Sequence, residues 1–525
     1  MRSSHFIPGI IVFAVFALIF ACASPKPLSG GPKDTLPPRI LDYESTPNKQ
    51  TNFHEKQITI TFDEWVQLKS VDQQLVISPL MPKKPEIKEK GKSMIITLPD
   101  SLRENTTYTL NFGNAIQDLN EGNKLENYSF IFSTGPFLDS IQWNGKVTDA
   151  VTLKPSPDTW VMLYPTGNDS AVYTKRPEYV TKTNKEGAWS ITNIRSDSFM
   201  VVALKDENLN FMYDLDNELF GWLDEYQQSD ESATLPEIKV SARPSRPIVQ
   251  AITQVAPGFM YAIIPGPIPK SLPVFQPSLQ SPHYEWVGDS LFIWSSQDIN
   301  YSGNIIVGTD TTRIRTVETK FIKNKPLILT SLTGRMYSGD DARIKSNVPV
   351  QKIDPALILL SKDTTSNIPF EAMLDSLSER IIRIHSQWVP ASRYHIAFLP
   401  GAITDGWGRA SDSISFSFVV SALDQFSNLH MQISGLDSTT HYIVQVMTGN
   451  VIHRVYAIHH QGTAEILSKG IDPGKYTIEL IEDRNDNGIW DPGDYHLKRQ
   501  PEKKIVFTPD NLRAGWDVDM TMEWK

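Results

Sequence analysis

Short segments in which every second residue is apolar recur along this chain, and they constrain its fold more than any other feature. Residues 58–62 (Ile-Thr-Ile-Thr-Phe) and 108–112 (Tyr-Thr-Leu-Asn-Phe) are two examples. Such alternation places apolar side chains on one face of a β-strand. Turn-rich breaks such as residues 89–92 (Glu-Lys-Gly-Lys) separate the segments at a spacing suited to two packed sheets. The sequence therefore predicts an all-β fold built from β-sandwiches.

The same patterns return in the second half of the chain. Residues 394–398 repeat the apolar alternation of residues 108–112, and residues 476–480 repeat that of residues 199–203. Both members of the second pair lead directly into an acidic loop. Repetition over this distance predicts an internal duplication, with a few modules on a tether rather than a long solenoid.

Length and composition limit the class of protein. With 525 residues the chain has room for several domains, and 40% hydrophobic with 21% charged residues is typical of folded globular proteins. Its 36 prolines and 29 glycines suit the many turns of β-modules. A formal net charge of −10 argues against nucleic acid as a partner, because phosphate binding requires a basic face.

Five short motifs follow the first strands: Thr61-Phe62-Asp63-Glu64, Leu75-Val76-Ile77-Ser78-Pro79, Asn105-Thr106-Thr107-Tyr108-Thr109-Leu110, Ile116-Gln117-Asp118-Leu119-Asn120-Glu121-Gly122-Asn123 and Phe130-Ile131-Phe132-Ser133-Thr134. With them the segment resembles the bacterial Ig-like domain of the S-layer SbsA type, as in envelope lipoproteins of Bacteroidetes-like bacteria. The resemblance implies a spacer or adhesive module without a catalytic residue. The segment after it is similar to transthyretin-like or carboxypeptidase-regulatory sandwiches.

These patterns divide the chain into seven segments. We predict a signal peptide (1–21), a lipidated cysteine with a Pro/Gly-rich tether (22–38), an Ig-like domain (39–136), a β-sandwich ending in an acidic loop (137–243), a β-rich middle module (244–340), a second Ig-like domain (341–421) and a second β-sandwich with a calcium-type loop (422–525).

The single cysteine, Cys22, indicates the cellular location of the protein. Arg2 precedes an apolar run over residues 7–21, which has the length of a signal peptide and is short for a membrane span. The run ends Ile-Phe-Ala-Cys, which resembles the lipobox of bacterial lipoproteins, in which the signal is removed before the cysteine and the thiol is acylated. A plain signal peptide followed by an unrelated cysteine is the alternative.

Acylation of Cys22 with palmitate-type chains anchors a protein to a membrane, since each buried CH₂ contributes about 0.8 kcal/mol. It also leaves no thiol for redox or nucleophilic chemistry. Ala23 and Ser24 follow the cysteine, so the aspartate that retains some lipoproteins in the inner membrane is missing. We therefore expect a lipid anchor in the outer membrane, and the sequence leaves the periplasmic and surface faces both open.

An acidic loop at residues 483–494 predicts a calcium site. The expected ligands are the side chains of Asp483, Asn485, Asn487, Asp491 and Asp494 and the backbone carbonyl of Ile489. Calcium takes six to eight oxygen ligands, which alternate Asp and Asn side chains around a glycine turn supply. Asp494 stands where an EF-hand has a bidentate Glu, so we expect modest affinity. The alternative is a solvated acidic turn that holds no ion.

A weaker copy of this loop occurs earlier in the chain. Its expected ligands are Asp206, Asn208, Asn210, Met212 and Asp214. Phe211 occupies the position of the turn glycine, which makes this copy the weaker candidate for calcium. An ion in either loop would have a structural role, pinning the loop and stiffening a domain joint. We expect no other cofactor.

Few motifs indicate catalysis. Residues 90–93 (Lys-Gly-Lys-Ser) resemble the end of a phosphate loop but lack its first glycine. His453, His459 and His460 lack the His-Glu-x-x-His spacing, and neighbouring histidines on one strand face opposite ways, so one metal rarely takes both. No Gly-x-Ser-x-Gly elbow occurs. The sequence therefore predicts a protein that is not an enzyme.

The function predicted from these features is a non-catalytic, outer-membrane-anchored lipoprotein that acts as a scaffold or binding arm in the envelope. Its partners would be the membrane and either an outer-membrane barrel protein or a glycan. Two alternatives remain. One is an accessory subunit of an outer-membrane assembly or transport complex. The other is a glycan- or peptide-cleaving enzyme with its site in the middle module, 244–340.

Overall fold

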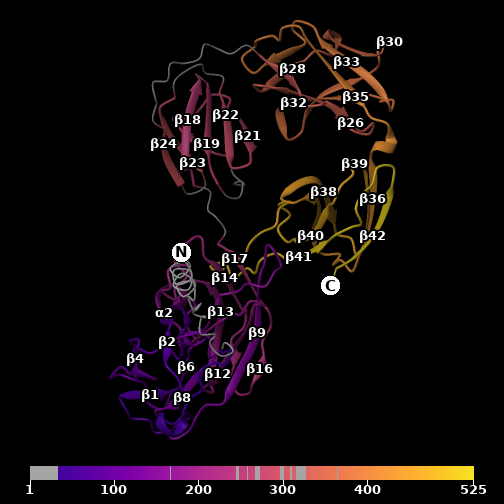
Figure 1. Cartoon of the computed structure of the whole chain (residues 1–525). Coiled ribbons are helices and arrows are strands. Elements are labelled where there is room, and N and C mark those ends of the chain that lie inside the picture. The colour runs from indigo at the N-terminus through magenta and orange to yellow at the C-terminus, as the bar shows by residue number, and fades with distance from the viewer. Residues whose placement is uncertain are drawn as a thin grey trace, which may run out of the picture.

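The computed structural model describes residues 34–165, 167–243, 248–256, 258–265, 272–295, 301–307, 310–314, 327–363 and 365–524. Strands dominate, and they form five β-modules with separate hydrophobic cores, which we call the first to fifth sandwiches (Figure 1). The all-β prediction is confirmed. Cys22 and the signal segment lie outside the described residues.

The first sandwich packs three small sheets around one core. Ile58, Ile60 and Phe62, which the alternation placed on one face, are all fully buried there. The sheet orders are β1-β5-β4, β3-β6-β8 and β2-β7. The elements are η1 (Asp42–Glu44), β1 (Gln57–Thr61), β2 (Val66–Leu68), α2 (Val71–Gln74), β3 (Val76–Ser78), β4 (Glu86–Lys90), β5 (Ser93–Thr97), β6 (Thr107–Asn111), β7 (Ile116–Asp118) and β8 (Ser129–Ser133).

The second sandwich is one nine-stranded sheet that curls around its core, with the order β11-β10-β13-β14-β17-β9-β12. Strands β10 and β13 are apolar on both faces, because a second apolar cluster lies outside the sheet. The elements are β9 (Ile141–Asp149), β10 (Trp160–Pro165), α3 (Ala171–Thr174), β11 (Tyr179–Lys182), β12 (Ala188–Ile194), β13 (Ser198–Lys205), β14 (Leu219–Trp222), β15 (Gln227–Gln228), β16 (Ala233–Thr234) and β17 (Ile238–Ala242).

The third sandwich pairs a four-stranded sheet, β18-β19-β22-β21, with a three-stranded one, β20-β23-β24. Its described core contains Met260, Phe275, Leu291 and Ile305. The strands are β18 (Ala251–Ala256), β19 (Phe259–Ile263), β20 (Val274–Gln276), β21 (His283–Val287), β22 (Ser290–Trp294), β23 (Gly303–Val307) and β24 (Asp310–Ile314).

The fourth sandwich begins earlier than the sequence boundary at residue 341. Strands β25 and β26, which fall in the expected middle module, pair with β27 and β35, and Leu329 and Met336 lie in the fourth core. The elements are β25 (Leu329–Ser331), β26 (Arg335–Met336), β27 (Ala342–Ser346), β28 (Val350–Ile353), η2 (Pro355–Leu357), β29 (Ile358–Lys362), β30 (Thr365–Ser366), β31 (Glu371–Asp375), β32 (Ser378–His385), β33 (Ser392–Phe398), β34 (Ile403–Asp405) and β35 (Ile414–Val420).

The fifth sandwich packs the sheet β39-β36-β42 on the sheet β38-β37-β40-β41. Its elements are η3 (Leu423–Gln425), β36 (Ser427–Ser434), β37 (His441–Thr448), β38 (Val451–His459), β39 (Ala464–Ile471), β40 (Thr477–Asp483), β41 (Lys504–Phe507) and β42 (Asp517–Glu523).

The expected internal duplication is present in the order of the main strands of each sheet. In the first and fourth sandwiches, the order β1-β5-β4 corresponds to β27-β32-β31, β3-β6-β8 to β29-β33-β35, and β2-β7 to β28-β34. In the second and fifth, β11-β10-β13-β14 corresponds to β38-β37-β40-β41. The parallel pair β9-β17 likewise corresponds to β36-β42. The apolar repeat in the sequence thus reflects one duplication, in which the first and second sandwiches recur as the fourth and fifth.

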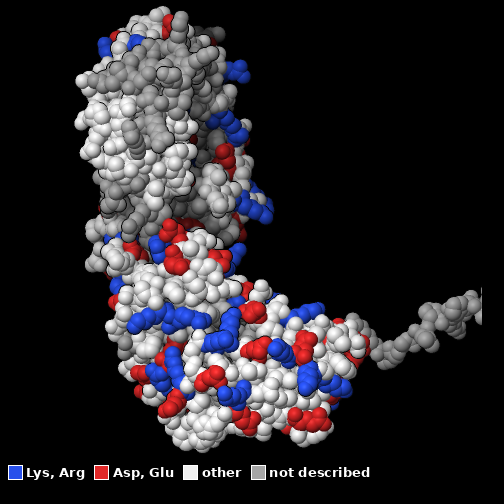
Figure 2. Space-filling model, turned by 90° about the vertical axis from the view of Figure 1, so that its left-hand side faces the viewer, with Lys and Arg blue, Asp and Glu red and all other residues white. Residues whose placement is uncertain are grey.

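The modules form an arch rather than a string of beads. In Figure 1 the first and second sandwiches lie together, the third and fourth lie at the opposite end, and the fifth returns toward the second. Figure 2 shows basic and acidic side chains interspersed over the visible face of the lower part of the molecule.

Candidate functional site

The first acidic loop follows β13 and folds around Asp206. The carboxylate of Asp206 accepts hydrogen bonds from the backbone N–H groups of Leu209 (2.7 Å) and Phe211 (2.8 Å). The side-chain amides of Asn208 and Asn210 donate to the carboxylate of Asp214, at 3.1 and 2.8 Å. The loop therefore gathers these acidic and amide side chains.

Phe211 and Met212 have other roles in this loop. Phe211 has a φ of 64° and its side chain is buried in the apolar cluster outside β10 and β13. Its backbone therefore has the left-handed conformation that glycine usually adopts at such a turn. The N–H of Met212 donates to Oδ1 of Asn210 at 2.6 Å.

The second acidic loop repeats this arrangement after β40. The carboxylate of Asp483 accepts from the N–H groups of Asn487 (3.0 Å) and Gly488 (2.7 Å), and Gly488 has a φ of 78°. Oδ2 of Asp491 accepts from the side-chain amides of Asn485 and Asn487, the latter at 3.1 Å. Four of the expected side-chain ligands are therefore brought together.

Ile489 and Asp494 lie differently. The N–H of Ile489 donates to Oδ1 of Asn487 at 3.0 Å, and its side chain is exposed. The backbone of Asp494 exchanges two hydrogen bonds with Arg499, at 2.7 and 2.9 Å. Its carboxylate accepts from the N–H of Leu497 at 3.2 Å. Asp494 thus closes the turn that follows the loop.

A buried glutamate closes each loop, and the motif spacing did not reveal either role. Glu502 accepts from the N–H groups of Arg484 and Asp491, both at 2.9 Å, and burial raises the pKa of its carboxyl to about 7. Glu218 accepts from the N–H groups of Asp214 and Leu215, both at 3.1 Å, and burial raises its pKa as well. Glu502 lies beyond the motif, in the segment that leads to β41, so only the fold brings it back.

The chain that leaves the second loop docks onto the second sandwich. The N–H of Gly493 donates to the hydroxyl of Ser241 on β17, at 2.9 Å. The side-chain amide of Gln500 donates to the carbonyl of Trp222 on β14, at 3.1 Å. Residues 252 and 278 positions apart in the chain are therefore joined by hydrogen bonds between the two sandwiches.

An aromatic cluster completes this joint. Tyr495 is 5% exposed and lies 5.1 Å from Phe220, 5.2 Å from Trp222 and 6.1 Å from Tyr173, measured between ring centroids. Phe220 also stacks on Tyr213 of the first acidic loop, at 4.3 Å. Aromatic pairs at such distances contribute beyond their buried area. Tyr213 belongs to the first acidic loop, Phe220 and Trp222 follow it, and Tyr495 follows the second loop. These side chains pack into one aromatic core, which we call the loop joint.

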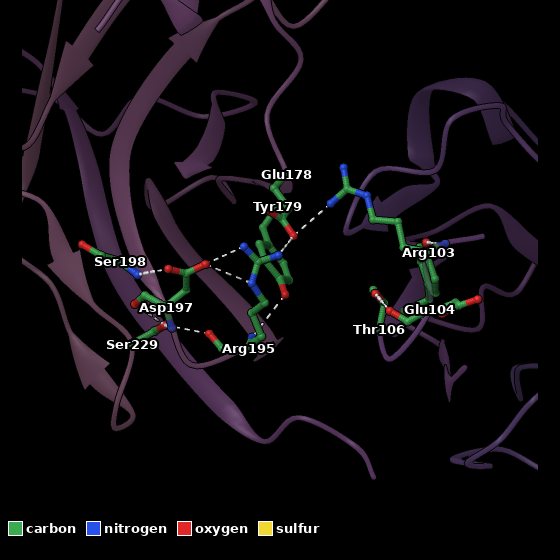
Figure 3. Close-up of polar contacts among 10 residues, drawn as sticks. Arg103, Glu104, Thr106, Glu178, Tyr179, Arg195, Asp197, Ser198 and Ser229 are labelled. Atoms are coloured by element: carbon green, nitrogen blue, oxygen red, sulfur yellow. Dashed lines mark hydrogen bonds and ion pairs between the residues drawn. The ribbon is translucent and has the colours of Figure 1, made fainter. Parts of the chain in front are cut away.

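Polar contacts between the first and second sandwiches centre on Glu178 (Figure 3). Its carboxylate is buried and pairs with Arg195 of its own sandwich and with Arg103 of the first, the latter at 2.9 Å. Arg195 also pairs with Asp197, and its hydrogen bond lowers the pKa of that carboxyl. A carboxylate so placed fixes the two sandwiches relative to each other.

An open cleft of about 910 Å³ lies where the third, fourth and fifth sandwiches meet. Its volume is within the range of small-molecule sites. Burial raises the pKa of the Asp340 carboxyl, while Arg454 opposes that shift. The cleft carboxylates pair with arginines: Glu285 with Arg380, Asp340 with Arg454, Asp341 with Arg383, Asp375 with Arg343, and Asp472 with Arg335.

The fold and these joints define a multi-domain all-β protein with Ig-like modules. Residues 34–134 match the model of the family described as bacterial Ig-like domain, in agreement with the resemblance of the first sandwich. No curated protein matches the chain. Across the described residues, every helix is too short or too polar to cross a membrane.

Solved structures offer distant likenesses. The S-layer protein rSbsC is 12% identical, with 87% of this chain and 66% of that chain covered and a TM-score of 0.14. The Bacillus anthracis TIE protein is 10% identical, with 95% and 76% covered and a TM-score of 0.14. BcpA, the major pilin subunit of Bacillus cereus, is 9% identical, with 73% and 98% covered and a TM-score of 0.13. The chain thus spans just under two thirds of rSbsC, and likeness at this level says nothing about function.

Proposed function

We propose that this protein is a non-catalytic lipoprotein scaffold of the bacterial envelope, held in the outer membrane by acyl chains on Cys22. The loop joint is the observation that carries the proposal. It connects the fifth sandwich to the second through Tyr495, which is 5% exposed. Because a buried joint connects the fifth sandwich to the second, the arch keeps one arrangement of its sandwiches. A spacer or binding arm requires such a fixed shape.

The open cleft supports a structural role over an enzymatic one. Eight described residues of its lining fall within residues 244–340, where the enzyme alternative placed its site: Glu285 and Trp286 of the third sandwich, and Leu332, Thr333, Arg335, Met336, Tyr337 and Asp340 of the fourth. Glu285 pairs with Arg380, and their side chains are each about 10% exposed. Carboxylates engaged by arginine in this way are committed to contacts within the protein. The five ion pairs instead connect neighbouring strands and sandwiches around the cleft.

Substitution of Cys22 tests the anchor. The full chain and Cys22→Ser are expressed in the native host, and membranes are separated by density and labelled with a palmitate analogue. We expect the wild-type chain in the outer-membrane fraction with label, and the variant outside that fraction without label. Equal distribution of both chains, or label on the variant, would contradict the proposed anchor.

We also propose a structural calcium ion in the second acidic loop. Oδ1 of Asn485 is buried and has no hydrogen-bond partner among the described residues, while the amide nitrogen of the same side chain donates to Asp491. An unpaired buried oxygen is costly, and a cation would satisfy it. An ion that binds only the folded state stabilises it by about 2.7 kcal/mol when free calcium is 100 times Kd.

Thermal unfolding in calcium and in chelator tests this ion. We expect the fifth sandwich to unfold at a higher temperature in calcium, and Asn485→Ala to reduce the difference. Asn208→Ala, in the first loop, is the matched control and should preserve most of it. Equal unfolding temperatures of the wild-type protein in calcium and in chelator would contradict the proposal.

A further inference from the structure

We infer that His441, His459 and Asp486 form a binding site for a transition-metal ion of the zinc type at the end of the fifth sandwich. The site goes beyond the proposed scaffold function. It is also distinct from the calcium ligands, because none of its three residues belongs to that set. One ligand atom from each residue lies within 4.8 Å of the other two.

The two histidines are placed by strand pairing. His441 begins β37, His459 ends β38, and the two residues are direct partners in the antiparallel register. Directly opposite residues on paired strands have Cβ atoms roughly 4.5–5.5 Å apart on one face. The two Nδ1 atoms lie 2.7 Å apart, with the ring centroids separated by 4.9 Å. The sheet itself therefore brings two imidazoles together.

The acidic loop supplies the third group. Oδ1 of Asp486 lies 3.4 Å from Nδ1 of His441 and 3.8 Å from Nδ1 of His459. Asp486 has a φ of 54°, so the loop turns back over the strand end at this residue. Two imidazole nitrogens and a carboxylate oxygen thus face a common point.

These distances suit zinc better than calcium. Zinc binds imidazole nitrogen and carboxylate oxygen at roughly 2.0–2.2 Å in a tetrahedral arrangement, so that ligand atoms lie roughly 3.3 Å from one another. The His441–Asp486 distance of 3.4 Å is close to this value, whereas the two Nδ1 atoms, at 2.7 Å, would have to separate by rotation of the rings when the ion binds. Calcium prefers oxygen ligands. His459 and Asp486 are about half exposed, which leaves the fourth position accessible to water.

The neighbouring His460 does not face away, as strand alternation alone would predict. Strand β38 ends at His459, and His460 has a φ of 51°. Its ring therefore lies against His441, with centroids 4.4 Å apart. His453, by contrast, packs against Tyr476 at 5.5 Å. Strand alternation does not apply to His460 because the strand ends at His459. His453 lies away from the site and therefore serves as a control for metal binding by an unrelated histidine.

A metal at this point would connect β37, β38 and the second acidic loop. The same loop continues to Tyr495, which lies in the loop joint. The ion would therefore pin the base of the segment that joins the fifth sandwich to the second.

Zinc titration of the full chain in detergent tests the site. Binding of Zn²⁺ alone is measured by calorimetry at neutral pH, and Co²⁺ is added as a spectroscopic probe. We expect one ion per chain, and a Co²⁺ spectrum of low-coordinate type. His441→Ala and Asp486→Asn should each weaken binding at least tenfold, and His453→Ala should leave it unchanged. Excess Ca²⁺ should not displace the zinc.

Several outcomes would overturn the assignment. They are the absence of Zn²⁺ binding, equal affinity in the wild-type and Asp486→Asn chains, displacement by Ca²⁺, and loss of binding in His453→Ala. If His441→Ala fails to fold, His459→Gln replaces it, because that side chain is 52% exposed. Retention of wild-type affinity by His459→Gln would equally exclude the site.

Discussion

Gly470 shows how one residue determines a contact between sandwiches. It has a φ of 70°, and a Cβ atom added there would lie 2.3 Å from the ring of Tyr337. Tyr337 belongs to the fourth sandwich and also packs against Phe426, with ring centroids 5.5 Å apart. Only glycine combines this backbone conformation with such a close approach.

Replacement of Gly470 by alanine is therefore expected to destabilise the protein more than the backbone conformation alone requires. Gly449→Ala is the matched control, because Gly449 has a φ of 58° and a Cβ atom added there would have no neighbour within 4 Å. We expect the control to lower the free energy of unfolding by about 1–2 kcal/mol. Gly470→Ala should lower it by roughly 1–3 kcal/mol more. Denaturant unfolding measures both, and equal losses would contradict the close approach.

His430 is expected to titrate above its ordinary pKa of 6.5. Its ring pairs with Asp519 at 2.9 Å and with Glu465 at 2.6 Å, and these hydrogen bonds, that of Asp519 first, raise its pKa. The imidazolium therefore stabilises the fold fully below pH 6.5, and this contribution is lost as the pH rises through the raised pKa. Titration by NMR measures the shift. Asp519→Asn should lower the pKa, and an unchanged value would contradict the pairing.

At the scale of elements, the joint at Glu178 explains why two sandwiches keep one orientation. Glu178→Ala leaves Arg103 and Arg195 without their shared buried partner. We expect a loss of about 1–3 kcal/mol, because both arginines remain partly hydrated. Lys56→Ala is the control, since its pair with Asp100 is exposed and should contribute little. Denaturant unfolding compares the two variants. If the Glu178→Ala chain were as stable as the control, the joint would contribute nothing to the free energy of unfolding.

Strands were predictable because alternation is a local property. Residues 58–62 and 108–112 carry it in adjacent positions, and their buried faces are those the pattern indicated. The duplication was predictable for the same reason. Strands β25 and β26 were assigned to the wrong module, because their partners β27 and β35 lie farther along the chain. Short strands of two or three residues do not reveal their neighbours.

The candidate site was predictable only where its residues are close in sequence. Asp483, Asn485, Asn487 and Asp491 gather within one loop, as the motif spacing indicated. Glu502 returns to that loop from outside the motif. His441 joins His459 through strand register, and Tyr495 reaches another sandwich, so neither contact leaves a local sequence pattern.

At the scale of the whole molecule, the central feature is closure of the arch by the loop joint. Lys498 lies over the ring of Tyr495, at 3.7 Å from its centroid, and its Nζ is 3.3 Å from Oδ2 of Asp169 in the second sandwich. Both charged side chains are about half exposed, so reagents can reach them. This ion pair therefore reports directly on whether the fifth sandwich docks on the second.

Zero-length coupling of amines to carboxylates, followed by mass spectrometry, tests this closure. We predict a covalent link between Lys498 and Asp169 in the wild-type chain and its loss in Tyr495→Ala. The Lys56–Asp100 pair within the first sandwich, at 2.9 Å, should be linked in both chains. A wild-type chain that yields the Lys56–Asp100 link without the Lys498–Asp169 link would contradict the closed arch.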